Sequence, residues 1–258
     1  MKETVSPEAL TFSSVPNFRD LGGIVVDGNK KIKKGIIFRS ANPDSISKEE
    51  IKRFEMLNIR TIVDLRAPGE YGSRAGSVDH IDRLSLPLDF QQTTRERLRP
   101  YINKRDSEAA IADISNSLYL DMLDAVQPLF RQVIEVLLSQ ERCPVLIHCH
   151  VGKDRTGIMC ALILLALGVG RQQIIDDFMK SNEALRPFFE KIFRKKRILS
   201  LGFLPPRMMM YAVTVRQRNI ESVIDRVSDH YGGIEAYLQE SGFDISRLNE
   251  LKMNLLEG

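Results

Sequence analysis

Short apolar runs alternate with polar and amphipathic stretches through the N-terminal part of the chain. The runs at 61–65, 83–88 and 143–148 have the length and composition of β-strands. The last of these is apolar enough to be buried on both faces of a sheet. Two further runs, 23–26 and 35–38, flank an Asp-Gly-Asn turn signal and predict a β-hairpin.

Helical spacing dominates the remainder of the sequence. Apolar residues recur at this spacing over 115–139, where we expect Pro128 to kink or split the helix. After Thr156 the pattern predicts helices at about 156–168, 171–181, 183–196, 206–229, 233–240 and 245–256. Strands that alternate with helices, followed by a helical C-terminal half, predict an α/β fold with a central, mostly parallel sheet flanked by helices.

The composition excludes several classes of protein. Of the 258 residues 43% are hydrophobic, so the chain can bury a sizeable core and is not disordered. Its net charge of +3 does not by itself favour nucleic-acid binding, and we expect no such partner. The longest apolar run, 158–169, is shorter than the roughly 20 residues that a membrane span needs.

The cysteines point to a reducing compartment. Three cysteines are too few and too scattered for a disulfide framework, so we expect free thiols. The first ten residues lack the apolar segment of a secretory signal. A cytoplasmic protein is therefore the default expectation, with unconventional export left open.

The segment from His148 to Gly157 carries the clearest chemistry. A buried strand delivers Cys149 to the edge of the sheet, Gly152 permits a tight turn, and a long apolar helix begins near Thr156. The backbone N–H groups of the loop and of the first helical turn converge on one point. They form an anion cradle whose field also favours a thiolate at Cys149.

Two basic side chains complete this cradle. The guanidinium of Arg155 offers a fork of donors that matches two phosphate oxygens, and Lys153 adds a mobile positive charge. A thiolate that faces a phosphate cradle and an arginine is suited to phosphoryl transfer through a phosphocysteine. We therefore expect Cys149 to be the nucleophile and Arg155 to bind phosphate.

The motif His-Cys-x5-Arg-Thr at 148–156 resembles the signature of the cysteine-based tyrosine phosphatase superfamily. Further blocks at 17–23, 38–40, 64–66 and 231–238 resemble the bacterial "tyrosine phosphatase 3" family of dual-specificity and phosphoinositide phosphatases. The resemblance implies a tyrosine-phosphatase-like fold and one phosphatase domain over 1–258. It also implies phosphotyrosine, phosphoserine or phosphothreonine, and phosphoinositides as substrates, without a cofactor or a metal.

The resemblance assigns roles within the loop. Substrate contacts are expected from the residues that follow the cysteine: His150, Val151, Gly152, Lys153 and Thr156. In the resembled family the aspartate of this loop is the general acid, which makes Asp154 our first candidate, ahead of Asp89 and Asp64. We expect a raised pKa for Asp154, because its carboxylate is an anion beside the phosphate cradle.

Four charged residues in the matching N-terminal blocks have two interpretations. Arg19, Asp20, Arg39 and Arg66 either line the site or form ion pairs that brace the loop from behind. Because Arg66 follows a strand, we include it among the substrate-binding candidates.

Two polar segments are candidate lids. We expect 91–106 to be an exposed excursion or a lid within the domain. The basic segment at about 183–205, which contains Lys191, Arg194 and Lys195, is either an amphipathic helix with a charged outer face or a mobile helical lid. A lid with a basic face would attract anionic substrates or make peripheral contact with anionic membrane.

The sequence thus predicts a phosphatase that acts on phosphorylated protein, phosphoinositide or small phosphate esters. One alternative is an inositol-phosphate phosphatase of the phytase type. The other is a pseudophosphatase that binds phosphate without turnover, although the intact Cys149, Asp154 and Arg155 argue against it.

Overall fold

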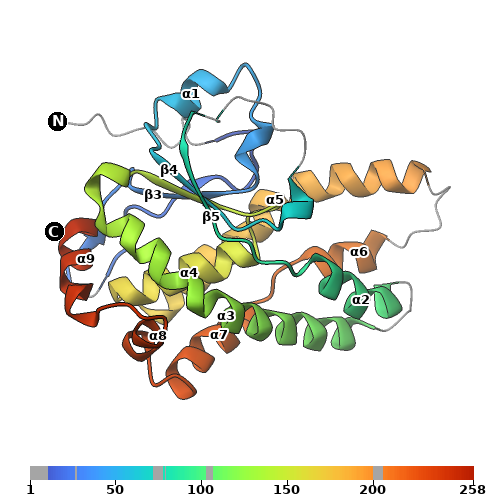
Figure 1. Ribbon diagram of the computed structural model, residues 1–258. Coiled ribbons are helices and arrows are strands. Elements are labelled where there is room, and N and C mark those ends of the chain that lie inside the picture. Colours follow the sequence, from blue (N-terminus) through green and yellow to red (C-terminus); the bar gives the residue numbers. More distant parts are fainter. Residues whose placement is uncertain (1–10, 27, 72–77, 79, 103–106, 200–205) are drawn as a thin grey trace.

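The computed structural model describes residues 11–26, 28–71, 78, 80–102, 107–199 and 206–258. Its centre is a sheet of five short strands in the order β1-β3-β6-β4-β5 (Figure 1). These strands are β1 (Arg19–Asp20), β3 (Ile37–Ser40), β6 (Val145–His148), β4 (Thr61–Asp64) and β5 (Asp82–Ser85). The pairs β3–β6, β6–β4 and β4–β5 are parallel, and only the edge strand β1 is antiparallel to its neighbour.

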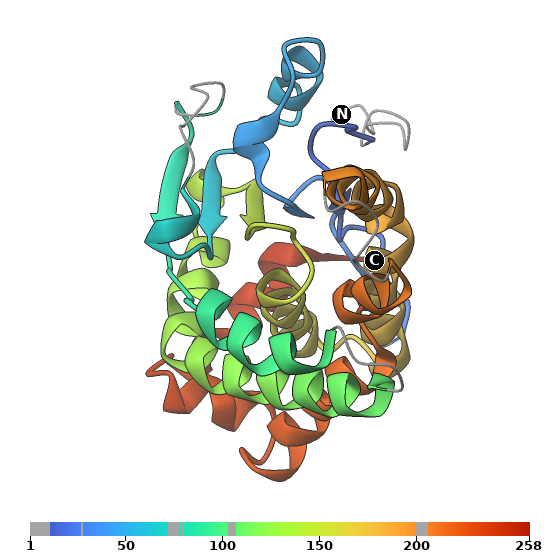
Figure 2. The same cartoon turned by 90° about the vertical axis from the view of Figure 1, so that its right-hand side faces the viewer.

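Helices cover both faces of the sheet, very unequally. The short α1 (Ile51–Glu55) lies on one face, and the main helical layer lies on the other (Figures 1 and 2). That layer contains α3 (Glu108–Leu138), α4 (Arg155–Leu167), α5 (Arg171–Leu199), α7 (Gln217–Asp229), α8 (Ile234–Glu240) and α9 (Leu248–Leu255). The helices α2 (Gln91–Ile102) and α6 (Pro206–Val213) lie beside the N-terminal part of α3. The predicted α/β class with a mostly parallel sheet is therefore confirmed.

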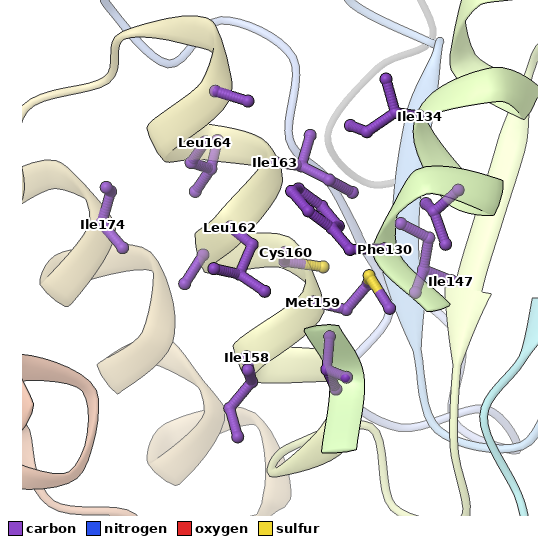
Figure 3. Packing of buried hydrophobic residues seen from close by; sticks show 14 of the residues in the cluster. Phe130, Ile134, Ile147, Ile158, Met159, Cys160, Leu162, Ile163, Leu164 and Ile174 are labelled. Carbon is purple, nitrogen blue, oxygen red and sulfur yellow. The ribbon is translucent and has the colours of Figure 1, made fainter. Parts of the chain in front are cut away.

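The two-residue period of the strands divides the core. Ile62 and Leu146 face the α1 side, where they join a small aromatic cluster that includes Phe54. Val63 and Ile147, their neighbours in sequence, face the opposite side and belong to the main core. In that core α4 packs between the sheet and α3, with nearly every side chain buried (Figure 3). The strand end that precedes Cys149 is thereby held on both faces.

Several predicted boundaries differ in the structure. Val25 bridges Lys31 across the expected turn, but the run at 35–38 contributes to β3 and pairs with β1 and β6. A small second sheet joins β2 (Lys31–Ile32) to β7 (Leu256–Glu257). Hydrogen bonding with a distant part of the chain, which periodicity cannot show, decides this pairing.

Helix boundaries also depend on tertiary contacts. Pro128 lies inside one continuous α3, and the two helices expected at 171–181 and 183–196 form the single helix α5. The helix expected at 206–229 is divided into α6 and α7. The break occurs where the Asn182 side chain both donates to the Val215 carbonyl and accepts from its N–H group, at 2.8 and 2.9 Å. The polar segment 91–106 is helical over α2.

The remaining elements are short. They are the 3₁₀ turns η2 (Pro43–Ser45), η3 (Pro68–Glu70), η4 (Gln140–Arg142) and η5 (Ile245–Arg247). Among the helices of the described residues, none is both long and apolar enough to cross a membrane.

Candidate active site

The 149–155 loop connects the end of β6 to the first residue of α4. Cys149 is buried, and the N–H group of Gly152 donates a hydrogen bond to its Sγ at 3.3 Å. Gly152 has a φ of +75°, and a Cβ there would lie 2.1 Å from the carbonyl oxygen of Ser40. Only glycine fits this position, so the turn and the N–H group that it aims at the sulfur depend on that residue.

Arg155 is held in place by a carboxylate and two carbonyl groups. Its Nη1 donates to Glu70 at 2.5 Å, to the Leu88 carbonyl at 2.9 Å and to the Leu65 carbonyl at 3.2 Å, while Nη2 donates to Glu70 at 2.8 Å. Burial lowers the pKa of Arg155, but Glu70 and the nearby Cys149 outweigh burial and raise the pKa above its ordinary value. Within the described part of the chain, Nε and one Nη2 proton have no hydrogen bond and remain available to an anion.

The carboxylate of Asp154 accepts two hydrogen bonds on one oxygen. The Tyr119 hydroxyl donates to Oδ1 at 2.6 Å, and Lys153 Nζ lies 2.7 Å from the same atom. Burial raises the pKa of Asp154, but Lys153 and Tyr119 together outweigh burial and hold the pKa below its usual range. The raised pKa that we expected for Asp154 is therefore wrong, because these two donors stabilise the carboxylate.

The other loop residues occupy different positions. Thr156 is buried, and its Oγ1 has no hydrogen-bond partner among the described residues. His150 is exposed and Val151 is half-buried. The His150 carbonyl accepts from the N–H group of Asn42 at 3.2 Å, so the outer part of the loop is fastened to the segment that follows β3.

Behind the loop, buried polar groups hold its backbone. The carbonyl of Gly152 accepts from the Asn17 side chain at 2.7 Å and from Arg39 Nη2 at 3.1 Å. Asp177, on α5, binds Arg39 at 2.7 Å and Arg19 at 2.8 Å. Of the two interpretations of Arg19 and Arg39, the ion pairs behind the loop are the one that matches their positions. Asp20 accepts from two glycine N–H groups, of Gly22 and Gly35.

A second buried network surrounds Asp64. Its carboxylate accepts from Arg66 at 2.6 Å and from Arg83 at 2.7 Å, and it lies 3.5 Å from His148 Nε2. Burial raises the pKa of Asp64, yet His148 and Arg66 hold it far below the ordinary value. Arg66 is 1% exposed and also pairs with Asp44. An aspartate held so firmly in its ionised form is a poor proton donor, which disfavours Asp64 as the acid.

Asp89 has a freer environment than Asp64. It is exposed, and its carboxylate accepts from the N–H group of Gln91 at 3.3 Å. It follows Leu88, whose carbonyl binds Arg155, so it lies near the site.

For Arg66, the proposed contact with substrate stays a prediction. Among its guanidinium nitrogens, only Nη1 has no hydrogen-bond partner in the described structure.

The comparisons with known proteins identify this arrangement. The model of the tyrosine phosphatase family matches residues 10–257. The chain belongs to the tyrosine phosphatase family. It is therefore a phosphatase, and the resemblance seen in the sequence is confirmed.

Three relatives of this phosphatase match most of its length. A putative tyrosine-protein phosphatase of Cupriavidus necator is 26% identical over 90% of this chain and 83% of the relative. The triple specificity protein phosphatase PtpB of Mycobacterium tuberculosis is also 26% identical, over 93% of this chain and 96% of its own length. A tyrosine-protein phosphatase of Nostoc commune is 24% identical over 97% and 90% of the two chains.

Solved structures of other phosphatases are similar at a lower level. The core catalytic domain of the PP-IP phosphatase SIW14 from S. cerevisiae matches with 18% identity and a TM-score of 0.40, over 66% of this chain and 78% of that one. TpbA of P. aeruginosa, solved with phosphotyrosine, matches with 18% identity and a TM-score of 0.31, over 58% and 72% of the two chains.

Three residues that contact the phosphatase site did not emerge from the sequence. Glu70 binds Arg155, which lies 85 positions away in the sequence. Tyr119 binds Asp154 across 35 positions. Asp177 binds Arg19 across 158 positions. Glu70 had one usable signal, since it closely follows the end of β4, where the carboxyl ends of parallel strands meet. Tyr119 and Asp177 lie within long helices, and no sequence pattern around them distinguishes them from other polar residues of those helices. Across the described residues, no group of three or more His, Cys, Asp or Glu side chains could hold a metal ion.

Proposed function

We propose that this phosphatase hydrolyses phosphate monoesters through a phosphocysteine at Cys149. The thiolate attacks phosphorus, an S–P bond forms, and the bond from phosphorus to the leaving oxygen breaks. The N–H groups of the 149–155 loop and Arg155 neutralise the equatorial phosphate oxygens. The observation that carries this proposal is the burial of Cys149, whose Sγ accepts from a glycine N–H group, close to Arg155, some of whose protons have no partner among the described residues.

Asp154 supplies the proton that the leaving oxygen requires. A bound phosphate dianion adds negative charge beside Asp154, opposes the effect of Lys153 and Tyr119, and so favours the protonated carboxyl. Water then attacks the phosphocysteine, gives a proton back to Asp154, and breaks the S–P bond to release inorganic phosphate. The buried Thr156 Oγ1, which has no partner among the described residues, hydrogen-bonds the sulfur in this proposal as the thiolate leaves.

We further propose that phosphotyrosine is the primary substrate, with phosphoserine, phosphothreonine and phosphoinositides as further ones. The breadth is supported by the name of the triple specificity relative. Lys153 supports it too, because its half-buried ammonium beside the loop can bind a second phosphate of an inositol ring. A specific inositol-phosphate phosphatase is the alternative that a substrate panel would reveal.

Contact with anionic membrane and a lid belong to the same proposal. The distal part of α5 carries the exposed side chains of Lys191, Arg194 and Lys195. A helical lid over about 183–205 would include this part of α5, and 200–205 lie outside the described residues. A catalytic thiolate also needs a reducing compartment such as the cytoplasm to stay active.

The decisive experiment measures release of inorganic phosphate from an aryl phosphate, phosphotyrosine, phosphoserine and phosphoinositide. Cys149→Ser should abolish turnover of every substrate, because a hydroxyl cannot replace the thiolate as nucleophile. Cys143→Ser is the matched control and should keep its activity, since Cys143 is a half-buried thiol whose Sγ lies 4.0 and 3.8 Å from the carbonyls of Val136 and Leu137 and which has no part in the proposed reaction. A wild-type protein without turnover of any of these esters would overturn the proposal in favour of a phosphate-binding pseudophosphatase.

A further inference from the structure

Tyr119 lies on α3, and its hydroxyl donates a hydrogen bond to Asp154 in the 149–155 loop. We propose that Tyr119 is a positioning residue for the general acid, and that its hydroxyl determines which carboxyl oxygen of Asp154 delivers the proton. The inference rests on the proposed function, in which Asp154 protonates the leaving group. It assigns a specific task to a residue outside the 149–155 loop.

Tyr119 is held rigidly. Its side chain is 3% exposed, and its ring packs edge-on against Phe178 with 5.8 Å between the centroids. Phe178 in turn lies so close to Gly157 that a Cβ there would be 2.8 Å from the ring. The hydroxyl therefore has little freedom to leave Asp154, and burial together with Asp154 keeps the pKa of Tyr119 well above its ordinary value.

The two oxygens of Asp154 are not equivalent. Oδ1 accepts from Tyr119 at 2.6 Å and contacts Lys153 Nζ at 2.7 Å, whereas the described residues place no donor on Oδ2. When the carboxyl is protonated, the proton therefore belongs on Oδ2. The O–H bond at Oδ2 then breaks as the leaving oxygen takes the proton, and the Tyr119 hydroxyl stabilises the carboxylate that results.

The other charged neighbours cannot perform the same task. Lys153 and Arg155 lie on the loop itself, and a phosphate dianion competes with Asp154 for their positive charges. Cys149 and Arg39 lie close enough to affect Tyr119 electrostatically, but neither contacts the carboxyl of Asp154. Tyr119 is thus the donor whose position does not depend on the bound phosphate.

Tyr119→Phe tests the inference with a series of aryl phosphates that differ in leaving-group pKa. A defect in proton donation grows as the leaving group becomes more basic, because good leaving groups depart without a proton. We expect kcat/KM to fall about 10-fold or more for phenyl phosphate and by less than about 3-fold for para-nitrophenyl phosphate. Tyr231→Phe is the matched control, since it also removes a tyrosine hydroxyl from an aspartate on α3 (Asp124, 2.8 Å) and should leave this dependence unchanged.

The double variant Tyr119→Phe/Asp154→Asn separates positioning from general support. If Tyr119 acts through Asp154, it loses no more phenyl phosphate activity than Asp154→Asn alone. Equal losses for all leaving groups, or additive losses in the double variant, would overturn the inference. So would an Asp154→Asn enzyme without leaving-group dependence, although Cys149-dependent turnover would then still stand. If Cys149→Ser retained activity, the proposed function itself would fail.

Discussion

Charged groups hold the 149–155 loop at its rear and at its mouth, and the two sets differ mainly in burial. At the rear, Arg39 and Asp177 form an ion pair whose side chains are 1% and 3% exposed. At the mouth, the side chains of Lys153 and Asp154 are 14% and 28% exposed. The distances are the same, 2.7 Å in both pairs. Burial rather than geometry therefore separates a pair that fixes the backbone from a pair that can rearrange when an anion binds.

Arg155 lies between these two cases. Glu70 holds it in a bidentate pair, as Asp177 holds Arg19, yet some of its protons have no partner among the described residues. A phosphate-binding arginine needs both a fixed orientation and free N–H donors. Without a partner to orient it, the side chain would lose conformational entropy when phosphate binds, and with every N–H group already hydrogen-bonded it could not bind phosphate.

The largest effect on stability is expected at the rear. Asp177→Asn leaves Arg19 and Arg39 buried without a carboxylate, and should lower the free energy of unfolding by about 3–5 kcal/mol in urea titration. The control is Asp225→Asn, which removes an exposed pair with Arg171 and should cost less than about 1 kcal/mol. Equal losses in the two variants would contradict the distinction.

The same pair predicts a dependence of stability on pH. Burial raises the pKa of Asp177, but Arg19 and Arg39 outweigh burial and lower the pKa to about 2. A carboxyl with a lowered pKa stabilises the fold above its unfolded pKa, near 4, and this contribution is lost as the pH falls toward 2. Unfolding of Asp177→Asn should therefore depend less on pH in this window than unfolding of the wild type.

Glu70→Gln should reduce activity more than stability. The glutamine keeps one acceptor oxygen but loses the negative charge and the second acceptor, so the bidentate pair that orients Arg155 toward phosphate is lost. We expect kcat/KM for an aryl phosphate to fall about 100-fold, or about 2.7 kcal/mol. Steady-state kinetics beside urea unfolding would test this, with Glu250→Gln, an exposed partner of Arg247, as the control. A variant that unfolds as readily as Asp177→Asn would place Glu70 with the rear network.

Lys153→Met should change the pH profile. Removal of the ammonium from Asp154 raises the pKa of this carboxyl, because Lys153 is the largest influence that lowers it. An acid must be protonated to act, so the fall of kcat/KM on the basic side should move to higher pH than in the wild type. Both enzymes are measured on one substrate, so that the titration of the substrate cancels. An unchanged profile would remove Asp154 from the role of acid and favour Asp89.

The smallest effect on stability is expected on the distal part of α5. Replacement of Lys191, Arg194 and Lys195 by glutamine should change the free energy of unfolding by less than about 0.5 kcal/mol for each residue, because these side chains are exposed. If this surface attracts anionic lipid, KM should rise for a phosphoinositide in vesicles and stay constant for para-nitrophenyl phosphate. Equal effects on both substrates would show that the charges do not contact the membrane.

Sequence patterns predicted the elements better than their partners. The apolar run before Cys149 is a buried strand, and the apolar run after Thr156 is a buried helix, since each pattern reflects burial directly. The expected hairpin is only partly present, because the run at 35–38 pairs instead with β6, which lies more than 100 positions later in the sequence. Residues 171–199 form one helix instead of two, and nothing local to the sequence specifies that the helix continues.

The sequence alone determined the loop of this phosphatase: a strand, a cysteine, a glycine that permits a tight turn, and an arginine at the start of a helix. These features are local, so spacing and residue type suffice to find them. Only the tertiary structure decided which side chains hold the loop from outside, since Glu70, Tyr119 and Asp177 come from three different elements. Their contacts form when sheet and helices pack together, and the pKa values of the carboxyl groups at the site follow from that packing.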